Sequence, residues 1–459
     1  MTSKTTELPV LIVGAGPAGL TAAATLARYG IEFLLVERRP ELSSLPRATG
    51  VSTRTMEIMR SFGLEERVRA AGEDVNWLVW TCESLARAGA GRGMPTGFPT
   101  PEQSAVVSPS GPACVPQDRL EPLLHEYVET LGVGQVELGT ELMDLRQERG
   151  GIRAELPDRT VRARYVIAAD GAHSRVRRSL GIEMRGPDRL QDAVSVLFRA
   201  PIWDLVGHHR YAIYMIAQAG AEGFFLPAGG DRWLYGLPHE PGGPLGRLTE
   251  AELVRRIQVA IGAPELEPRV ERTARFTFAA QLAERFRADN AFLIGDAAHR
   301  ATPRGATGMN TAIHDAFDLG WKLAWVLKGW ADSDLLDCYE AERRPVAEHN
   351  VAFSAEKHAP VRGQGHALQA DLGGRIPHAW VDGPAHHTST LDLLGAGLTL
   401  FTGPDAAAPP THARAPVEVR ALDAITARTL GIHSGGALLV RPDGLPADRA
   451  SASAARMAA

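Results

Sequence analysis

Residues 8–30 read LPVLIVGAGPAGLTAAATLARYG, and this stretch decides the fold of the first domain. The apolar run 8–13 predicts a buried strand, and small and apolar residues at helical spacing predict a helix that ends at Gly30. A second apolar run, 33–36, ends at Glu37. The spacing therefore predicts a strand, a helix and a strand within about 30 residues, the unit from which a doubly wound α/β sheet is built.

The glycines between this strand and helix have the pattern of a dinucleotide-binding turn. Gly14 permits the tight turn, Gly16 lets the backbone approach a pyrophosphate, and Gly19 lets the helix pack closely. The phosphates would meet the positive end of the helix, and Glu37 would accept hydrogen bonds from ribose hydroxyls. The residues assigned to this site are Gly14, Gly16, Pro17, Ala18, Gly19 and Glu37. The alternative is a tight turn without a ligand, and the motif alone does not separate NAD from FAD.

Length and composition argue against several other classes of protein. At 459 residues the chain is too long for one ordinary core and predicts two or three domains. A hydrophobic fraction of 44%, a charged fraction of 22% and a net charge of -5 are typical of globular proteins and give no reason to expect nucleic acid. No apolar run approaches the roughly 18 to 20 residues of a membrane span, and the short apolar N-terminus does not resemble a signal peptide, so we expect a cytoplasmic protein.

The cysteines give no sign of a disulfide or a metal centre. Cys82, Cys114 and Cys338 are an odd number and form neither a CxxC pair nor a zinc-binding spacing. We therefore expect buried free thiols and no metal site.

Changes in composition along the chain predict a domain that leaves and returns to the first one. Between residues 77 and 110 the sequence becomes rich in Gly, Pro, Ser and Thr, and from about 182 onward it carries alternating strands of an antiparallel sheet. The predicted units are a nucleotide-binding domain in three parts (1–76, 111–181 and 285–360), an inserted domain in two parts (77–110 and 182–284), a linker (361–388) and a C-terminal domain (389–459). The tail 450–459 is rich in Ser and Ala, and we expect it to be disordered.

A second motif favours FAD over NAD. The sequence GDAAH begins at Gly295 directly after the apolar run 291–294, and a long helix follows soon after it. An aspartate at that place, Asp296, can accept hydrogen bonds from ribityl hydroxyls, and backbone N–H groups at the start of the helix stabilise the negative charge of a reduced flavin. The alternative is that Asp296 and the alanines after it only cap a helix.

Together the motifs resemble a known family. GAGPAG with Glu37, the sequence VIAADGAHSRVR at 166–177, and GDAAH with Pro303 are similar to the class A flavoprotein monooxygenases of the p-hydroxybenzoate hydroxylase fold. The resemblance implies an α/β protein with a Rossmann-like FAD-binding domain and an inserted α+β substrate domain. The last segment resembles the thioredoxin-like domain of phenol, anthracycline and angucycline hydroxylases, in abbreviated form. It contains no cysteine, which leaves it a structural or oligomerisation role, with a homodimer as the candidate assembly.

The resemblance also assigns roles to individual residues. It places Glu37 and Arg38 at the adenosine ribose, Gln117 along the FAD chain, and Arg47 near the FAD phosphates and the path of the nicotinamide. It implies that Asp170, supported by Ser174 and Arg177, serves both FAD and nicotinamide. The catalytic candidates are Arg47 and Pro303, and the further cofactor-binding residues are Gly171, Asp296, Gly308, Met309 and Asn310. The alternative is that Arg47 and Arg177 form surface ion pairs and that Gln117 and Ser174 are helix caps. For His299 we prefer a structural role.

The implied reaction is hydroxylation of an aromatic or polyketide-like small molecule. NADPH or NADH would reduce FAD, and O₂ would give a flavin C4a-hydroperoxide, which needs surroundings that exclude water. Aromatic residues of the inserted strands could line the substrate site, but we expect them to belong to the core: His209, Tyr211, Tyr214, Phe224 and Tyr235.

Other functions remain open at this point. A Baeyer–Villiger or N-hydroxylating reaction uses the same flavin chemistry, and a non-catalytic flavin-containing binding protein belongs to a different class. A dehydrogenase would leave the Asp296 motif without a role, and the WxWxIP motif of flavin halogenases is absent. After Pro303 many members of the family have two glycines followed by Gln, Phe or Arg, whereas this chain has Gly305, Ala306 and Thr307. An alanine suits that turn only if its φ is not left-handed.

Overall fold

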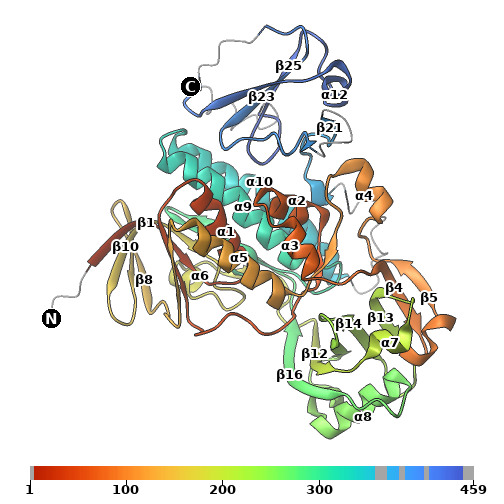
Figure 1. Ribbon diagram of the computed structural model, residues 1–459. Helices are drawn as coiled ribbons and strands as arrows, with labels where there is room; N and C mark the ends of the chain where they lie inside the picture. The colour runs from red at the N-terminus through yellow and green to blue at the C-terminus, as the bar shows by residue number, and fades with distance from the viewer. Residues whose placement is uncertain (1–4, 357–367, 369, 382–387, 408–412, 448–459) are drawn as a thin grey trace.

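The computed structural model describes residues 5–356, 368, 370–381, 388–407 and 413–447. A central unit built on the predicted nucleotide-binding sheet lies between two smaller parts, with the inserted sheet on one side and the C-terminal segment on another (Figure 1). The predicted tail 450–459 lies outside the described residues.

The central sheet is parallel where the sequence predicts it. Its strand order is β18-β19-β10-β1-β2-β7, and β8 and β9 form a hairpin that joins the edge of β10. The strands are β1 (Thr5–Val13), β2 (Phe33–Glu37), β7 (Gln135–Leu138), β8 (Asp144–Glu148), β9 (Gly151–Glu155), β10 (Thr160–Ala168), β18 (Arg287–Ala288) and β19 (Ala291–Leu293). Val10, Leu11 and Ile12 have no solvent-exposed surface, because a parallel strand at the centre of such a sheet is covered on both faces.

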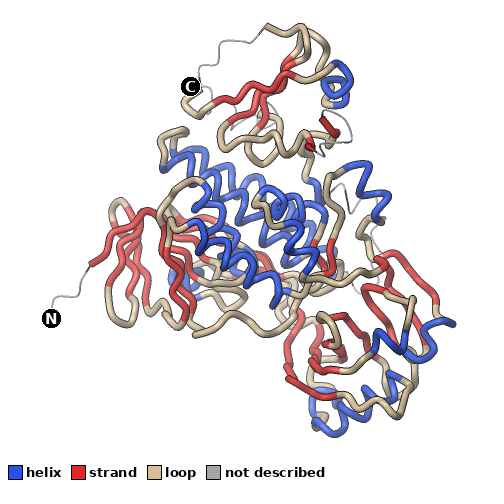
Figure 2. Tube along the Cα trace, viewed as in Figure 1, coloured by secondary structure: helices blue, strands red, loops and turns tan. Residues whose placement is uncertain are grey.

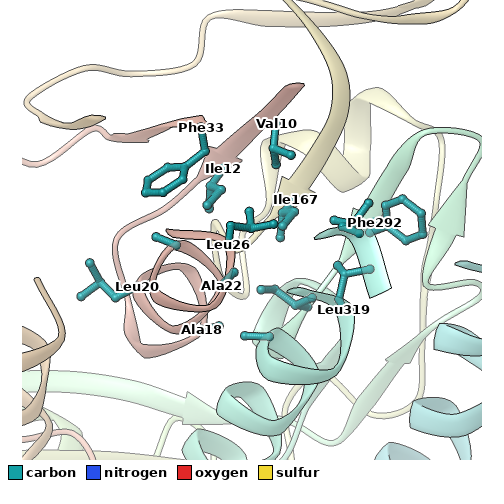
Figure 3. Packing of buried hydrophobic residues seen from close by; sticks show 14 of the residues in the cluster. Val10, Ile12, Ala18, Leu20, Ala22, Leu26, Phe33, Ile167, Phe292 and Leu319 are labelled. Carbon is teal, nitrogen blue, oxygen red and sulfur yellow. The ribbon is translucent and has the colours of Figure 1, made fainter. Parts of the chain in front are cut away.

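Helices cover this sheet and complete its core. In Figure 3, Ala18, Ala22 and Leu26 of the first helix approach the strands, and Leu319 of a later helix packs beside them. Figure 2 shows these helices gathered against the strands of the central unit. The helices of the unit are α1 (Pro17–Arg28), α2 (Thr53–Ser61), α3 (Glu65–Ala70), α5 (Gln117–Leu131), α6 (Arg175–Ser179), α9 (Gly308–Leu327) and α10 (Asp337–Ala355), with 3₁₀ turns η3 (Gly295–Ala297) and η4 (Ser333–Leu336). Gly320 lets α9 approach α1, because a Cβ there would lie 2.8 Å from Thr25.

The inserted domain has a seven-stranded sheet of its own, in the order β16-β12-β15-β14-β13-β4-β5. The prediction of an antiparallel sheet needs one correction, because β4 and β13 pair in parallel. The two strands come from separate excursions of the chain, so no tight turn imposes an antiparallel pairing on them. The strands are β4 (Asn76–Cys82), β5 (Arg92–Pro95), β12 (Gln191–Arg199), β13 (Tyr211–Ile216), β14 (Gly223–Pro227), β15 (Arg232–His239) and β16 (Arg269–Phe278).

One face of that sheet is buried beneath helices. Tyr214 and Tyr235 are fully buried there and Tyr211 nearly so, as expected for core aromatics. The covering elements are η1 (Leu85–Ala90), α7 (Ile202–Val206) and α8 (Glu250–Ile261), while α4 (Pro101–Val107) leads the chain back to the central unit. Smaller elements connect the parts: β3 (Gly50–Val51), β6 (Ala113–Cys114), β11 (Met184–Arg185), η2 (Pro244–Arg247), β17 (Gln281–Ala283) and β20 (His299–Arg300).

The C-terminal segment contains a small mixed sheet. In it β23 (Leu398–Thr402) pairs in parallel with β24 (Val417–Ala421) and antiparallel with β25 (Ala437–Val440), and α12 (Ala424–Thr429) lies between the last two strands in sequence. Before it in sequence, β21 (Trp380–Val381) and β22 (Thr388–Ser389) pair antiparallel. Ile376 of the predicted linker is 2% exposed and belongs to the core of this sheet, together with Phe401 and Val440. The C-terminal segment is therefore counted from residue 368.

Two sequence expectations can be checked directly. Cys82, Cys114 and Cys338 are buried free thiols, as predicted. Among the helices of the described residues, none combines the length and the apolar character needed to cross a membrane.

Candidate active site

The glycine turn after β1 is built for close approach. Gly14 has φ +107°, and a Cβ there would lie 2.4 Å from the carbonyl oxygen of Ala169. A Cβ on Gly19 would lie 1.9 Å from the oxygen of Gly14, whereas a Cβ on Gly16 would meet nothing within 4 Å. The first turn of α1 has no side-chain cap and no acidic residue. Its N–H groups and the open side of Gly16 therefore fit a pyrophosphate.

Glu37 lies beside this turn with its carboxylate already oriented. Its Oε2 accepts from the backbone N–H of Ala15 at 3.1 Å, and its Oε1 accepts from the N–H and Nε of Arg39. Burial alone would raise the pKa of Glu37, but these donors hold it below its ordinary value. A carboxylate offers about four acceptor positions, so one remains for a ribose hydroxyl. Arg38, which the resemblance places at the adenosine ribose, is exposed. Its neighbour Arg39 forms an ion pair with Glu37.

The second and third motifs end at the same edge of the sheet. Asp170 follows β10, and its Oδ2 accepts from the N–H groups of Arg175 and Val176 at 2.6 and 3.1 Å. Its carboxylate therefore shapes the Gly171 turn and the start of α6, and burial raises its pKa. Arg177 is 7% exposed and donates to the carbonyl of Ala297 at 3.4 Å, which links this motif to the next one.

Asp296 follows β19 and differs from Asp170 in having no hydrogen-bond donor among the described residues. Its side chain is accessible to solvent. The surrounding protein nevertheless raises the pKa of its carboxyl, while His299, Arg300 and Arg47 oppose that rise. Arg47, although far from Asp296 in the sequence, is close enough to act electrostatically on this carboxyl. An accessible acceptor beside a cation fits the ribityl chain of a flavin.

Gln117 is buried at the start of α5, and both its side chain and its backbone make hydrogen bonds to neighbouring residues. Its Nε2 donates to Glu121 Oε1 at 2.7 Å, and Glu121 Oε2 accepts from the N–H of Ser43 at 3.2 Å. The N–H of Gln117 donates to the carbonyl of Ala48. Burial raises the pKa of Glu121, a residue that sequence reasoning missed. Its position four residues after Gln117 on one helix was the available signal, because such residues share a face.

The loop 303–307, here called the flavin loop, lies between β20 and α9. Its N–H at Ala306 donates to the carbonyl of Pro303 at 3.1 Å. Ala306 has φ +50°, which is a left-handed backbone conformation. The sequence analysis expected an alanine to suit this turn only without such a conformation, and that expectation is not met. Such a conformation costs an L-residue about 1–2 kcal/mol relative to its ordinary backbone. The turn therefore keeps its glycine-like shape at an energetic cost.

The first turn of α9 offers unpaired donors next to this loop. The helix begins at Gly308 without a side-chain cap or an acidic residue, and Met309 and Asn310 follow in the same turn. The hydroxyl of Thr307 is buried and has no hydrogen-bond partner in the described part of the chain. These donors fit the negative edge of a reduced flavin ring.

His299 has the structural role that we preferred. It is 2% exposed, and its Nε2 lies 2.6 Å from Asp315 Oδ2. Arg343 Nε donates to the other oxygen of Asp315, and Gly295 N–H donates to Oδ2. Burial would raise the pKa of Asp315, but His299 and Arg343 lower it to about 2. This network fixes the turn that carries Asp296.

The fold and these features define a flavin-binding protein of the doubly wound type, with the candidate cofactor residues at the carboxyl ends of β1, β10 and β19. Residues 7–354 match the family described as FAD binding domain, and residues 369–459 match aromatic-ring hydroxylase, C-terminal. The chain belongs to this family, the class A flavoprotein monooxygenases, as its motifs predicted, and it is an FAD-dependent monooxygenase.

Similar proteins include hydroxylases named for aklavinone and a monooxygenase named for a dichlorophenol. Aklavinone 12-hydroxylase of Streptomyces purpurascens is 34% identical over 98% of this chain and 97% of its own length. The 2,4-dichlorophenol 6-monooxygenase of Cupriavidus pinatubonensis is 30% identical over 97% of this chain and 95% of its own. Among solved structures, a complex of aklavinone-11 hydroxylase with FAD and aklavinone has a TM-score of 0.86 and 32% identity, covering 96% of this chain and 95% of that one.

Proposed function

We propose that the protein hydroxylates a polycyclic aromatic molecule of the polyketide type, with NADPH or NADH and O₂ as co-substrates. The single observation that carries the proposal is an apolar second face on the inserted sheet, turned toward the residues that fit FAD. When bound, FAD would supply the activation of O₂ and the transfer of one oxygen atom by the route expected from the sequence.

The orientation of that face follows from one arginine. Trp233 is fully buried in the core of the inserted domain, so its neighbour Arg232 projects from the opposite face of β15. Arg232 donates to Asp118 Oδ2 at 2.8 Å and to the carbonyl of Ser44 at 3.2 Å. Both acceptors belong to the central unit, and Ser44 precedes Arg47 by three residues. The second face is therefore directed at the Arg47 segment.

Apolar side chains occupy this second face. Leu197, Leu234 and Leu226 are cross-strand neighbours on β12, β15 and β14. Phe224 lies over Gly236 of the next strand, where a Cβ would come within 2.2 Å of its ring. A flat, largely apolar polycycle would gain by burial against such a face. Of the aromatic residues considered from the sequence, Phe224 is thus the one placed to contact substrate.

The chain's own residues have three tasks in this reaction. The turn at Gly16 and the α1 N-terminus bind the pyrophosphate, Glu37 and Asp296 accept from sugar hydroxyls, and the α9 N-terminus stabilises charge on the flavin ring. Arg47, near Asp296 and exposed, is placed to meet an anionic co-substrate from the solvent side. The apolar second face excludes water from the reacting atoms.

The test uses the purified FAD-loaded protein, air, NADPH or NADH, and a panel of polycyclic aromatic polyketides beside simple phenols. We expect substrate-dependent oxidation of the nicotinamide and a product heavier by one oxygen atom. The variant Asp296→Ala serves as the control, since it should retain FAD poorly and lose the reaction. The proposal would be overturned if no compound of the panel raised the rate of nicotinamide oxidation and none gave an oxygenated product.

The same experiment separates the alternatives. A Baeyer–Villiger reaction also adds one oxygen but gives a lactone that opens on hydrolysis, and N-hydroxylation requires a nitrogen in the substrate. A non-catalytic binder would bind ligand tightly, yet anaerobic mixing with NADPH would leave the flavin absorption unbleached even in the presence of ligand.

A further inference from the structure

Helix α2 has two sides that lead to different parts of the molecule. On one side, Ser52 and Thr55 contact the side chain of Asn310 at the start of α9. On the other side, Arg54 and Glu57 contact the C-terminal segment. Both sets of contacts are buried or nearly so.

The first side holds the flavin loop through one amide. Asn310 Oδ1 accepts from the N–H of Ser52 at 2.9 Å and from the hydroxyl of Thr55 at 2.8 Å. Its Nδ2 donates to the carbonyls of Gly50 and Ala306 at 3.0 and 2.9 Å. Backbone groups fix which end of the amide faces which partner, and all four bonds are made. The carbonyl that it holds belongs to the left-handed residue of the flavin loop.

A histidine lies behind the Thr55 hydroxyl. His314 Nε2 is 3.0 Å from Thr55 Oγ1. Because the single proton of that hydroxyl goes to Asn310, the histidine is the donor in this contact. Burial, together with Arg343 and Arg54, keeps the pKa of His314 well below its ordinary value, so the ring is neutral. The hydroxyl of Thr55 also accepts from the hydroxyl of Ser52 at 3.3 Å, so its donor and both of its acceptor positions are used.

The second side of α2 is held by buried charges from the C-terminal segment. Arg375 donates from Nε to Glu57 Oε2 at 2.9 Å and makes a second contact with Oε1, and each side chain is 3% exposed. Arg54 donates its N–H to Asp371 Oδ2 at 2.9 Å and its Nη2 to the carbonyl of Asp443 at 2.6 Å. Both of these acceptors lie in the C-terminal segment.

Arg375 also contacts the segment that returns from the inserted domain. Arg375 Nη2 donates to the carbonyl of Val107 at 2.7 Å, and Ser108 Oγ donates to Glu57 Oε1 at 2.7 Å. Three parts of the chain thus meet at Glu57. Its pKa, which burial would raise, is lowered by Arg375 and Arg54, so the carboxylate stays charged.

We propose that Arg375 is a positioning residue for the flavin site, and that the C-terminal segment acts on the flavin loop through α2. Arg375 and Asp371 fix the Arg54–Glu57 side of the helix, and this fixes Ser52 and Thr55 where they complete the Asn310 amide. The amide in turn keeps Ala306 left-handed. The assignment of loop 303–307 to the flavin rests on the proposed function, whereas the mechanical link does not.

The test is hydrogen exchange of the full-length, FAD-loaded protein, read in peptides that cover the flavin loop. Arg375→Met should raise exchange there about tenfold, because Glu57 loses its bidentate partner and α2 its anchor. Thr55→Val should raise it about fivefold by removing one donor to Asn310. In the double variant the effect should stay close to that of the larger single change, since both act on one link.

The matched control is Arg60→Met. Arg60 lies at the other end of the same helix and pairs bidentately with Asp392 of the same C-terminal segment, at a partly exposed position. We expect its loop exchange to stay within twofold of the wild type. A second control, Thr25→Val, makes the same substitution as Thr55→Val at a buried helical hydroxyl that bonds within α1, and it too should leave the loop unchanged.

Several outcomes would overturn the proposal. One is unchanged loop exchange in Arg375→Met while peptides around 371–381 exchange faster. Another is an equal rise in Arg60→Met, or a rise that spreads evenly to β1, which would show general destabilisation. Multiplying effects in the double variant would show two independent links. If Arg375→Met does not fold, Arg375→Lys, which keeps the charge and loses the bidentate geometry, should show a smaller rise confined to the loop.

The hydrogen-exchange measurement does not depend on catalytic turnover. No substrate, nicotinamide or oxygen consumption enters the exchange measurement, so a failure of the proposed hydroxylation would leave this result standing. The FAD dissociation constant gives a second readout, expected to rise about tenfold in Arg375→Met and to stay within twofold in Arg60→Met.

Discussion

The C-terminal segment and the inserted domain are attached to the central unit in opposite ways. The C-terminal segment has a small core of its own around Phe401, but its Leu398, Ala415 and Ala447 are buried members of the central core. The inserted domain has a separate core, and its buried members all lie between residues 82 and 88 or between 194 and 263. One part shares its interior with the flavin-binding unit, and the other only lies against it.

The polar contacts follow the same division. Arg441, 1% exposed, donates to both oxygens of Glu342 at 2.8 Å, and Lys322, with no exposed side-chain surface, donates to Asp318 and Glu342. Across the other boundary, Arg232 pairs with Asp118. A part that shares buried residues with the central core moves with it, whereas a part that shares none can shift as a body. We therefore expect the inserted domain to shift more readily than the C-terminal segment.

The strongest test of this contrast is Arg441→Met. The change leaves Asp318, Glu342 and Asp443, whose oxygens lie within 4.8 Å of one another, with Lys322 as their buried cation. Removing one partner of a buried ion pair costs about 3–5 kcal/mol. We expect the free energy of unfolding in urea to fall by about that amount, in one transition for the whole chain. A separate early transition of the C-terminal segment would break the comparison.

Arg232→Met probes the other boundary. Asp118 is nearly buried and would lose its cation, at a cost of about 1–3 kcal/mol. We expect hydrogen exchange to rise at the boundary around residues 229–232 while the core strand β12 of the inserted domain and the C-terminal segment keep their protection. Equal loss of protection in the C-terminal segment would contradict the separation of the two boundaries.

Asp371→Asn sharpens the comparison through pH. Burial, together with Glu57, raises the pKa of Asp371 to about 6. A carboxyl whose folded pKa exceeds its unfolded value favours the folded state while protonated, so wild-type stability falls as pH rises from about 4 to 6. The amide avoids this loss. The variant should therefore be more stable by about 1–2 kcal/mol at pH 8 and nearly equal at pH 4, as measured by thermal unfolding. A difference that is constant over this range would exclude titration of Asp371 as its cause.

The smallest effect is expected at Arg414, whose pair with Asp332 also joins the C-terminal segment to the central unit. Both side chains are more than half exposed. Such pairs contribute about 0–1 kcal/mol because water screens the charges. Arg414→Ala should change the urea midpoint barely at all, and a loss as large as that of Arg441→Met would show that burial is not what distinguishes the two contacts.

Most of the candidate cofactor site could be predicted from the sequence, because each of its parts is formed by residues close together in the chain. The GAGPAG turn, the Asp170 turn and the Asp296 turn each depend on glycines and carboxylates within a few residues of one another. The inserted sheet was also foreseen as a set of strands. Its parallel β4–β13 pair was not, since an alternating pattern shows which face of a strand is buried but not which strand lies beside it.

What the sequence could not show depends on distant partners. Ala306 is left-handed, and Asn310, which donates to its carbonyl, also donates to the carbonyl of Gly50, 260 positions away in the sequence. Arg375 lay in the predicted linker, where a charged side chain is expected to be solvated, and its partner Glu57 is separated from it by most of the chain. The individual roles of the cofactor residues remain predictions.

The strand order of the central sheet has a consequence for how the protein is made. Strand β1 has β2 on one side and β10 on the other, and β10 begins only at Thr160. At about 5–20 residues per second, a ribosome needs roughly 10 to 30 s to move from the end of β1 to the end of β10. During that interval the side of β1 that will pair with β10 has no partner strand, and its residues Val10 to Val13 are all apolar. The speed of synthesis, more than the stability of the finished protein, sets how long that edge is open to a chaperone or to another nascent chain.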